Sequence, residues 1–493
     1  MKTNTLDFDA QALRERILDL AMRGKLVPQD PSDEPASVLL EKIKAEKEEL
    51  VKEKKIKKTK PLPEITDDEK PFDIPDSWEW VRCQKVTTIG NFQTVSPNEI
   101  TLGDNLIELA DIESYSGRLI NSEIVENKVG SNKYRYTKGQ VLFAKLRPYL
   151  RKILVAPNDG VCTTELLPIS GINVSNEYLY YIFMSDFFFN QIKKEMHGVN
   201  LPRVSPKKLS ELIFPLPPLS EQKRIAAKIA QLFALLRKVE SSTKQYAKLQ
   251  TLLKSKVLDL AMRGKLVKQD PNDEPASVLL EKIKAEKAEL VKEKKIKKSK
   301  PLSPITDEEK PFDIPDSWEW VRLGDISNFM NGFAYKSKLY VKKSNNQVIR
   351  LGNVKNDQLI VDKKQVFIDD DYADATNNYR IKKGDLLFTM TGTRNKRDYF
   401  FTLLVNEKDL NNHNLYLNQR VGCLNYIFGV NKLWLNYILK SQTILDEVFK
   451  NETGTVNQGN IGATKTMQIV IPLPPLSEQR RIATRIEQLD KLL

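Results

Sequence analysis

The chain has 493 residues, 40% of them hydrophobic and 29% charged, which is enough for more than one domain and typical of a protein with long exposed helices. Its formal net charge of +13 predicts a polyanionic partner, usually nucleic acid. The alternative is that the lysines only keep exposed helices solvated. No apolar run approaches the ~20 residues of a membrane span, and three isolated cysteines with two histidines argue against a disulfide framework, a metal site and histidine-based catalysis.

The first segment, residues 1–24, is predicted to be a helix that ends at Gly24. A basic arm follows in residues 25–77. It should contain a helix from Ala36 to about Lys58, with Lys and Glu at i, i+4 spacing on its outer side, and then a proline-rich connector. Residues 17–82 recur as residues 257–322 with eight mismatches, so the arm returns as residues 265–317.

The central segment, residues 219–264, is predicted to be one long helix with Ser220 as its N-cap. Apolar residues recur at alternating steps of four and three, which is a coiled-coil pattern over a rod of roughly 70 Å. The seam comprises Ile225, Ile229, Leu232, Leu236, Val239, Tyr246, Leu253, Val257 and Leu260. Such a rod cannot bury its seam alone and needs a second helix.

The two ends of the chain supply matching helices. Leu13, Ile17 and Leu20 repeat the spacing of the second half of the rod. In residues 476–493, the spacing of the first half recurs at Ile482, Ile486, Leu489 and Leu493. This is an internal repeat cut at a circularly permuted point, so the chain ends are expected to lie beside the central helix and antiparallel to it.

Two globular domains, residues 78–218 and 318–475, differ far more from each other than the segments around them. Both mix short alternating runs with Gly, Asn and Asp turns, so the predicted class is α+β. Each has a Lys-Gly turn, at 138–139 and 383–384, before an apolar strand. One amphipathic aromatic helix is predicted in each domain, near 177–193 and near 431–449.

Basic and amide side chains cluster on turns of both domains. Arginine forks suit guanine and phosphate, and Asn or Gln suits adenine, so these residues are candidate DNA contacts, with solvated loops as the alternative. The candidates of the first domain are Lys133, Arg135, Lys145, Arg147, Arg151, Asn200 and Arg203. The candidates of the second domain are Thr391, Thr393, Arg394, Lys396, Asn457 and Gln458.

Catalytic patterns are missing from the sequence. It has neither a dinucleotide loop nor a P-loop, and its Pro-Pro pairs do not follow Asn or Asp as in adenine methyltransferases. A nuclease site could be assembled only from Asp76 and the loosely spaced Glu126 and Lys128. We therefore assign no catalytic residue, metal or cofactor.

This layout resembles the specificity (S) subunit of type I restriction–modification systems, in which two variable target-recognition domains alternate with long repeat helices. The resemblance covers nearly the whole chain. It is carried by Pro-Leu-Pro-Pro-Leu-Ser-Glu-Gln at 215–222 and 472–479, Trp-Glu-Trp-Val-Arg at 78–82 and 318–322, and the basic loop 146–152. It departs at the C-terminal helix, which usually continues further: either the N-terminal helix completes that rod or the chain is truncated.

The resemblance implies two target-recognition domains separated by antiparallel coiled-coil helices with circular pseudo-two-fold symmetry. It also implies a non-enzymatic, cytoplasmic subunit that binds an asymmetric bipartite sequence in double-stranded DNA. Its partners would be two methylation (M) subunits and, in the full complex, restriction (R) subunits, with no membrane involved. The alternatives are a coiled-coil scaffold without base readout and a single-chain enzyme that combines recognition and nuclease functions.

Overall fold

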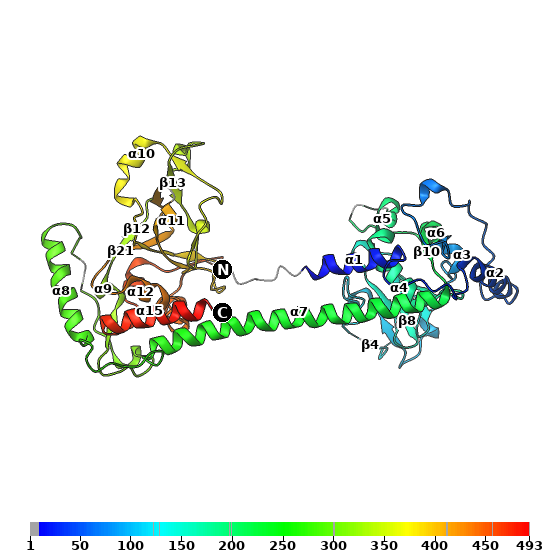
Figure 1. Ribbon diagram of the computed structural model, residues 1–493, viewed down its shortest axis with the longest axis horizontal. Coiled ribbons are helices and arrows are strands. Elements are labelled where there is room, and N and C mark those ends of the chain that lie inside the picture. The colour runs from blue at the N-terminus through cyan, green and yellow to red at the C-terminus, as the bar shows by residue number, and fades with distance from the viewer. Residues whose placement is uncertain are drawn as a thin grey trace. The chain divides into compact units, whose positions relative to one another are not determined.

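The computed structural model describes residues 9–121, 123–127, 129–196, 198, 200–298, 301–410, 413–455 and 457–492. It divides into two compact units, residues 1–244 and 245–493, and the division falls inside the 44-residue helix α7 (Leu219–Met262). Each unit combines helices with β-sheets (Figure 1), as predicted. In the described part of the chain no helix is both long and apolar enough to cross a membrane. The finer division into seven segments stays a prediction.

The first unit contains an end helix, an arm and a domain of small sheets packed on helices. Its described helices, besides α7, are α1 (Ala10–Met22), α2 (Ala36–Lys52), α3 (Cys83–Val86), α4 (Asn176–Met184), α5 (Asp186–Glu195) and α6 (Pro206–Glu211). Its described strands are β1 (Glu79–Arg82), β2 (Thr94–Val95), β3 (Asn105–Ile107), β4 (Glu123–Ile124), β5 (Lys133–Tyr136), β6 (Val141–Ala144), β7 (Ile153–Val155), β8 (Gly160–Thr163), β9 (Leu166–Ile169) and β10 (Ile213–Leu216). They pair in the orders β1-β10, β2-β5-β8-β3-β4 and β7-β6-β9.

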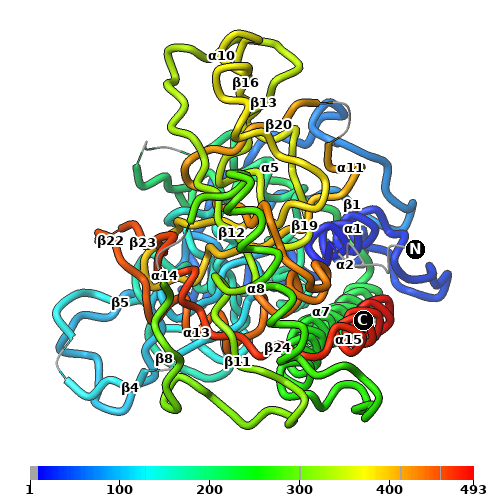
Figure 2. Tube along the Cα trace, turned by 90° about the vertical axis from the view of Figure 1, so that its left-hand side faces the viewer, coloured from blue at the N-terminus to red at the C-terminus, as the bar shows by residue number. Residues whose placement is uncertain are grey.

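The second unit repeats the arm and the β1-β10 pairing around a different domain. Its described helices, besides α7, are α8 (Ala276–Lys292), α9 (Leu323–Ile326), α10 (Asp370–Ala375), α11 (Glu407–Leu410), α12 (Lys432–Ile438), α13 (Gln442–Lys450), α14 (Ala463–Met467) and α15 (Leu476–Asp490). Its described strands are β11 (Glu319–Arg322), β12 (Ser327–Asn331), β13 (Asn346–Ile349), β14 (Val354–Lys355), β15 (Gln358–Leu359), β16 (Phe367–Ile368), β17 (Leu386–Thr389), β18 (Thr391–Gly392), β19 (Thr402–Leu404), β20 (Asn414–Leu417), β21 (Val421–Ile427), β22 (Thr453–Thr455), β23 (Gln458–Asn460) and β24 (Val470–Leu473). The main sheet has the order β12-β21-β17-β19, and α10 lies with β13 and β16 (Figure 2).

Helix α7 buries its apolar seam only where an end helix lies beside it. Ile225 and Ile229 are buried in the core of the first unit, where Arg14 of α1 pairs with Glu240 at 2.6 Å. In the second unit Asp490 of α15 lies 3.7 Å from Lys254. Both end helices run antiparallel to α7 (Figure 1). The described end helices begin at Ala10 and stop at Asp490, so the middle of the predicted seam is open: Tyr246 is 59% exposed and Leu253 51%.

A set of polar contacts joins the arm and the domain entrance to the start of α7. Glu221 accepts hydrogen bonds from Trp78 Nε1 at 2.8 Å and from Gln29 Nε2 at 2.6 Å, and Arg224 pairs with Asp33 at 2.6 Å. Burial raises the pKa of Glu221, against the lowering effect of these hydrogen bonds. The second unit repeats the contacts with Trp318, Glu478, Gln269, Arg481 and Asp273. The internal sequence repeat is therefore a repeat of packing.

The predicted helix ends at Gly24 and Gly264 are confirmed. Both glycines have left-handed φ values, of 67° and 66°, and a Cβ on either would lie within 2.5 Å of a proline ring. The predicted N-cap at Ser220 is wrong by two positions, because α7 begins at Leu219, which places the N-cap at Pro218, and the Ser220 hydroxyl donates to Asp33.

Four other predicted helices end early or break. The arm helices α2 and α8 stop at Lys52 and Lys292, not near 58 and 298, because a left-handed turn follows each. Each predicted aromatic helix is two helices. Ser185 separates α4 from α5 and Ser441 separates α12 from α13, and each serine oxygen caps the second helix of its pair.

Candidate nucleic-acid interface

In the first unit the strand after the Lys-Gly turn leads directly into a second segment of the domain. Gly139 has φ 84°, and the fully buried strand β6 follows it. Beyond β6, Leu146 forms a bridge with Arg203, and the Arg147 amide donates to the carbonyl of Pro202 at 2.8 Å. The structure therefore brings the predicted 145–147 and 200–203 groups onto neighbouring backbone segments.

Several candidate side chains of this cluster remain open. Arg147 and Asn200 are exposed and Lys145 is half-buried. Within the described residues, the guanidinium of Arg147 makes no hydrogen bond or ion pair. Arg203 pairs with Glu165 at 3.3 Å while staying 47% exposed. Arg147 sits at φ 48°, a left-handed conformation that strains a residue with a Cβ.

The other candidates of the first unit each lie beside a carboxylate of the protein. Lys133 is buried, with its ammonium 2.5 Å from Glu108. Arg151 is also buried, where it pairs with Asp186, donates to the Met184 carbonyl and stacks over an aromatic ring. Arg135 lies 3.7 Å from Asp104 and is one-third exposed. Lys133 and Arg135 both lie in strand β5, as the alternation predicted, and the charge of each lies next to a carboxylate of the protein.

In the second unit the candidates gather on one small sheet. Strands β18, β23 and β22 pair in the order β18-β23-β22, with Thr391 opposite Asn460. All six candidates lie in this sheet or in its adjoining loops: Thr391, Thr393, Arg394, Lys396, Asn457 and Gln458. Arg394, Lys396 and Asn457 are exposed, and Arg394 donates to the carbonyl of Gly454 at 3.3 Å. The hydroxyl of Thr391 is buried and has no hydrogen-bond partner among the described residues, so it does not face solvent.

Two acidic side chains fix the shape of that loop by accepting hydrogen bonds from its backbone amides. The Thr393 amide donates to Asp398 at 2.7 Å, and the Asn395 amide donates to Glu452 at 3.3 Å. Burial opposes ionisation of Asp398, but its hydrogen bonds with Thr393 hold its pKa below the ordinary value, so it is charged at neutral pH. A Cβ at Gly459 would lie 1.9 Å from the carboxylate of Glu452, so a larger residue there would require that carboxylate to move.

Two exposed residues of these loops escaped the sequence analysis. Tyr149 is 37% exposed between Arg147 and Arg151, and Asn395 is exposed with φ 63°. An aromatic residue after a proline in a basic loop, and an Asn between Arg and Lys, were the available signals. Lys128, part of the alternative nuclease site, lies outside the described residues.

Comparisons with known proteins decide the family. Residues 75–249 and 315–493, together well over half of the chain, match the family described as the type I restriction modification DNA specificity domain. The chain belongs to this family. Each match includes one of the two loop clusters and one of the two Pro-Leu-Pro-Pro-Leu-Ser-Glu-Gln blocks, 215–222 or 472–479.

Full-length relatives and solved structures agree with this specificity family. The chain is 35% identical to the type I restriction enzyme EcoAI specificity subunit of Escherichia coli, over 98% of this chain and 89% of that protein. It is 32% identical to the EcoEI specificity subunit, over 98% and 90%. The HsdS subunit from Thermoanaerobacter tengcongensis has the same fold, with a TM-score of 0.52 and 21% identity over 86% of this chain and 91% of that one. A chain from a study of complex assembly and conformational transition in the type I R-M system gives a TM-score of 0.56, 21% identity, and coverage of 86% and 92%.

Proposed function

We propose that this chain is the DNA-recognition subunit of a type I restriction–modification complex, and that each of its two domains reads one half of a bipartite target. The observation that carries the proposal is the pair of loop clusters. In each unit a Lys-Gly turn and a buried strand lead to a basic loop, and a second backbone segment pairs with that loop. The same construction thus presents two different sets of side chains.

The side chains suggest how each half-site is read. In the first unit Arg147 and Lys145 suit guanine or phosphate, and Asn200 suits adenine. In the second unit Arg394 and Lys396 suit guanine or phosphate. The neighbouring amides of Asn457 and Gln458 suit adenine. Because the two sets differ, the two half-sites differ, and the circular repeat favours their opposed orientation. Asymmetric bipartite recognition follows from these two features.

Catalysis belongs to partners in this proposal. Two methylation subunits transfer a methyl group to adenine, restriction subunits cleave DNA, and S-adenosylmethionine binds the methylation subunits. The buried contacts of Glu221 are repeated at Glu478, so the chain has two equivalent junctions between arm and rod helix, which suits two copies of one partner. The complex acts in the cytoplasm, where its DNA is.

A selection experiment tests the proposal against both alternatives. The purified chain is incubated with a pool of randomised 40-base-pair duplexes, and bound duplexes are sequenced. We expect two unlike short motifs at a fixed separation. A scaffold would enrich no motif, and a single-chain nuclease would cut the pool when Mg²⁺ is added without any partner. Methylation-sensitive sequencing of DNA from cells that also express the methylation subunits should find adenine methylation at the same motif.

A further inference from the structure

Lysines gather in the helix and the following turn of each arm, whereas the rest of each arm is acidic. Residues 36–60 and 276–300 together contain eighteen lysines and nine glutamates and no other charged residue. The two segments therefore carry a net charge of +9 within arms that are otherwise negative. The two segments are identical at 23 of 25 positions, whereas the domains that separate them have diverged.

Each arm helix ends in a tightly fixed lysine turn. In the first unit the Lys54 amide donates to Val51 at 3.1 Å, and the Lys55 amide donates to Leu50 at 2.9 Å. Ile56 is buried beyond this turn, and the Lys57 amide donates to the Asn91 side chain at 2.8 Å. The corresponding turn of the second unit has the same hydrogen bonds at Lys294 and Lys295 and the same buried isoleucine at 296. Backbone and isoleucine are anchored while the lysines point outward.

Most of these lysines form no ion pair with another described residue of the chain. Lys52, Lys54, Lys57 and Lys58 are exposed, and their ammonium groups make no ion pair with any described residue, whereas Lys55 pairs with Glu53 at 2.8 Å. The counterparts Lys292, Lys294, Lys297 and Lys298 are also exposed and unpaired among the described residues, and Lys295 pairs with Glu293.

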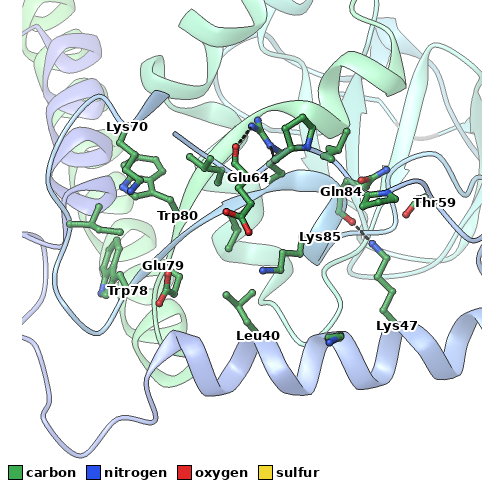
Figure 3. Close-up of a pocket in the computed structure, with 18 of the residues that line it drawn as sticks. Leu40, Lys47, Thr59, Glu64, Lys70, Trp78, Glu79, Trp80, Gln84 and Lys85 are labelled. Atoms are coloured by element: carbon green, nitrogen blue, oxygen red, sulfur yellow. Dashed lines mark hydrogen bonds between the residues drawn. The ribbon is translucent and has the colours of Figure 1, made fainter. Parts of the chain in front are cut away.

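Lys47 shows what a structural lysine of the same helix looks like. It points toward a cavity of about 1800 Å³ between α2, the connector and α3, where its ammonium donates to the Gln84 carbonyl (Figure 3). Burial lowers the pKa of Lys47.

One lysine of each turn has a left-handed backbone conformation, which lysine rarely adopts. Lys54 has φ 59° and Lys294 has φ 56°, and this is the position after a helix where glycine is the favoured residue. Both copies hold lysine at this strained position. A locally unfavourable residue that recurs in both units points to a selected role for its charge.

We propose that the lysine turn of each arm, residues 52–58 and 292–298, binds phosphates of the DNA backbone without reading bases. The inference rests on the proposed function. A DNA backbone is the same whatever its sequence, so one unchanged surface can serve two unlike half-sites. An acidic protein partner fits less well. Protein interfaces bury apolar and aromatic residues at their centre, and the one apolar residue of each turn, Ile56 or Ile296, is already buried.

The test is the salt dependence of binding by the full-length chain. The variant Lys54→Gln/Lys57→Gln/Lys294→Gln/Lys297→Gln is titrated with target and scrambled duplexes at several KCl concentrations. We expect the slope of log K against log salt to become shallower by about 0.9 for each phosphate that the variant no longer neutralises. Affinity should fall by the same factor for both duplexes, so the preference for the target is kept.

A matched control removes the same number of charges elsewhere on the repeat. Lys42, Lys70, Lys282 and Lys310 are each ion-paired, and their replacement by Gln should leave the slope near that of the unmodified chain. Equal slopes for the turn variant and the control would overturn the proposal. So would a selective loss of target preference, which would indicate base reading.

Two further measurements distinguish a loss of phosphate binding from a loss of folding and from a failure of the proposed function. Lys54→Gly relieves the left-handed strain, so it should keep or raise the melting temperature. Its slope of log K against log salt should still be shallower than that of the unmodified chain. If the unmodified chain shows no sequence preference, the proposed function fails, and the slopes measured on scrambled duplex still decide the role of the lysine turns.

Discussion

Replacing Arg147 with alanine separates base reading from simple charge. Its guanidinium is exposed and makes no bond to any other described residue, so we expect the free energy of unfolding to stay within about 0.5 kcal/mol. A bidentate contact with guanine is worth about 1–3 kcal/mol. The variant should therefore bind its target roughly 5–150-fold more weakly, with discrimination relaxed at one base pair of one half-site and unchanged in the other.

The assay compares matched duplexes with single-mismatch duplexes at several salt concentrations. Arg147→Lys keeps the positive charge but loses the bidentate guanidinium. This variant should therefore lose base discrimination while retaining most of the salt dependence of binding. Arg151→Ala is the control for folding: this buried arginine pairs with Asp186, and its loss should lower the unfolding free energy by about 2 kcal/mol. Uniform weakening by Arg147→Ala would refute base reading and leave a phosphate contact, and unchanged binding would refute both.

Three other perturbations have defined outcomes. Deleting four residues near Thr243 removes about 6 Å of helix, so binding-site selection should return the same two half-sites with a spacer shortened by one or two base pairs; an unchanged spacer would contradict a measuring role for α7. Trp78→Phe leaves a buried oxygen of Glu221 without its donor, so urea unfolding followed by circular dichroism should show a loss of about 1–3 kcal/mol, and Trp318→Phe a similar loss. Burial raises the pKa of Asp385 from 3.8 to about 6, so its neutral form favours the folded state. The contribution of Asp385 to stability should be complete below pH 4 and fall by up to about 3 kcal/mol as pH rises through 6, so the stability difference between the unmodified chain and Asp385→Asn should change with pH by that amount.

Local signals predicted the framework because they act locally. Gly24 stops a helix through its own backbone conformation, and the Lys-Gly turn at 138–139 starts a strand in the same way. The serine that divides each aromatic helix was also a readable signal, because Ser185 is a strong N-cap residue within a helical pattern. The arm helix ended early for a non-local reason. Its lysine-rich sequence favours helix beyond residue 52, but burial of Ile56 bends the chain first.

The candidate contacts were harder to assign from sequence, since charge alone does not identify its partner. Alternation in β5 places Lys133 and Arg135 on a common side but does not say which side faces the core. Lys133 meets a carboxylate 25 residues away and Arg151 meets one 35 residues away, and no local pattern announces either pair. The sequence therefore identified the loops correctly as basic and left open which of their side chains are free.

The places where the two units agree explain why their domains can differ. Each arm and each domain entrance are joined to a rod helix by Trp, Gln, Asp and Arg around one buried glutamate, Glu221 or Glu478. None of those residues belongs to a recognition loop. The loop of the second unit takes its shape from hydrogen bonds to its own acids, Asp398 and Glu452, and the loop of the first unit from backbone pairing with residues 202–204. A change in loop sequence therefore leaves the junction contacts intact, while a change at the junction would disturb either domain in the same way. Under the proposed function, variation in target sequence is thus confined to the loops, and a nearly unchanged repeat can carry two unlike recognition surfaces.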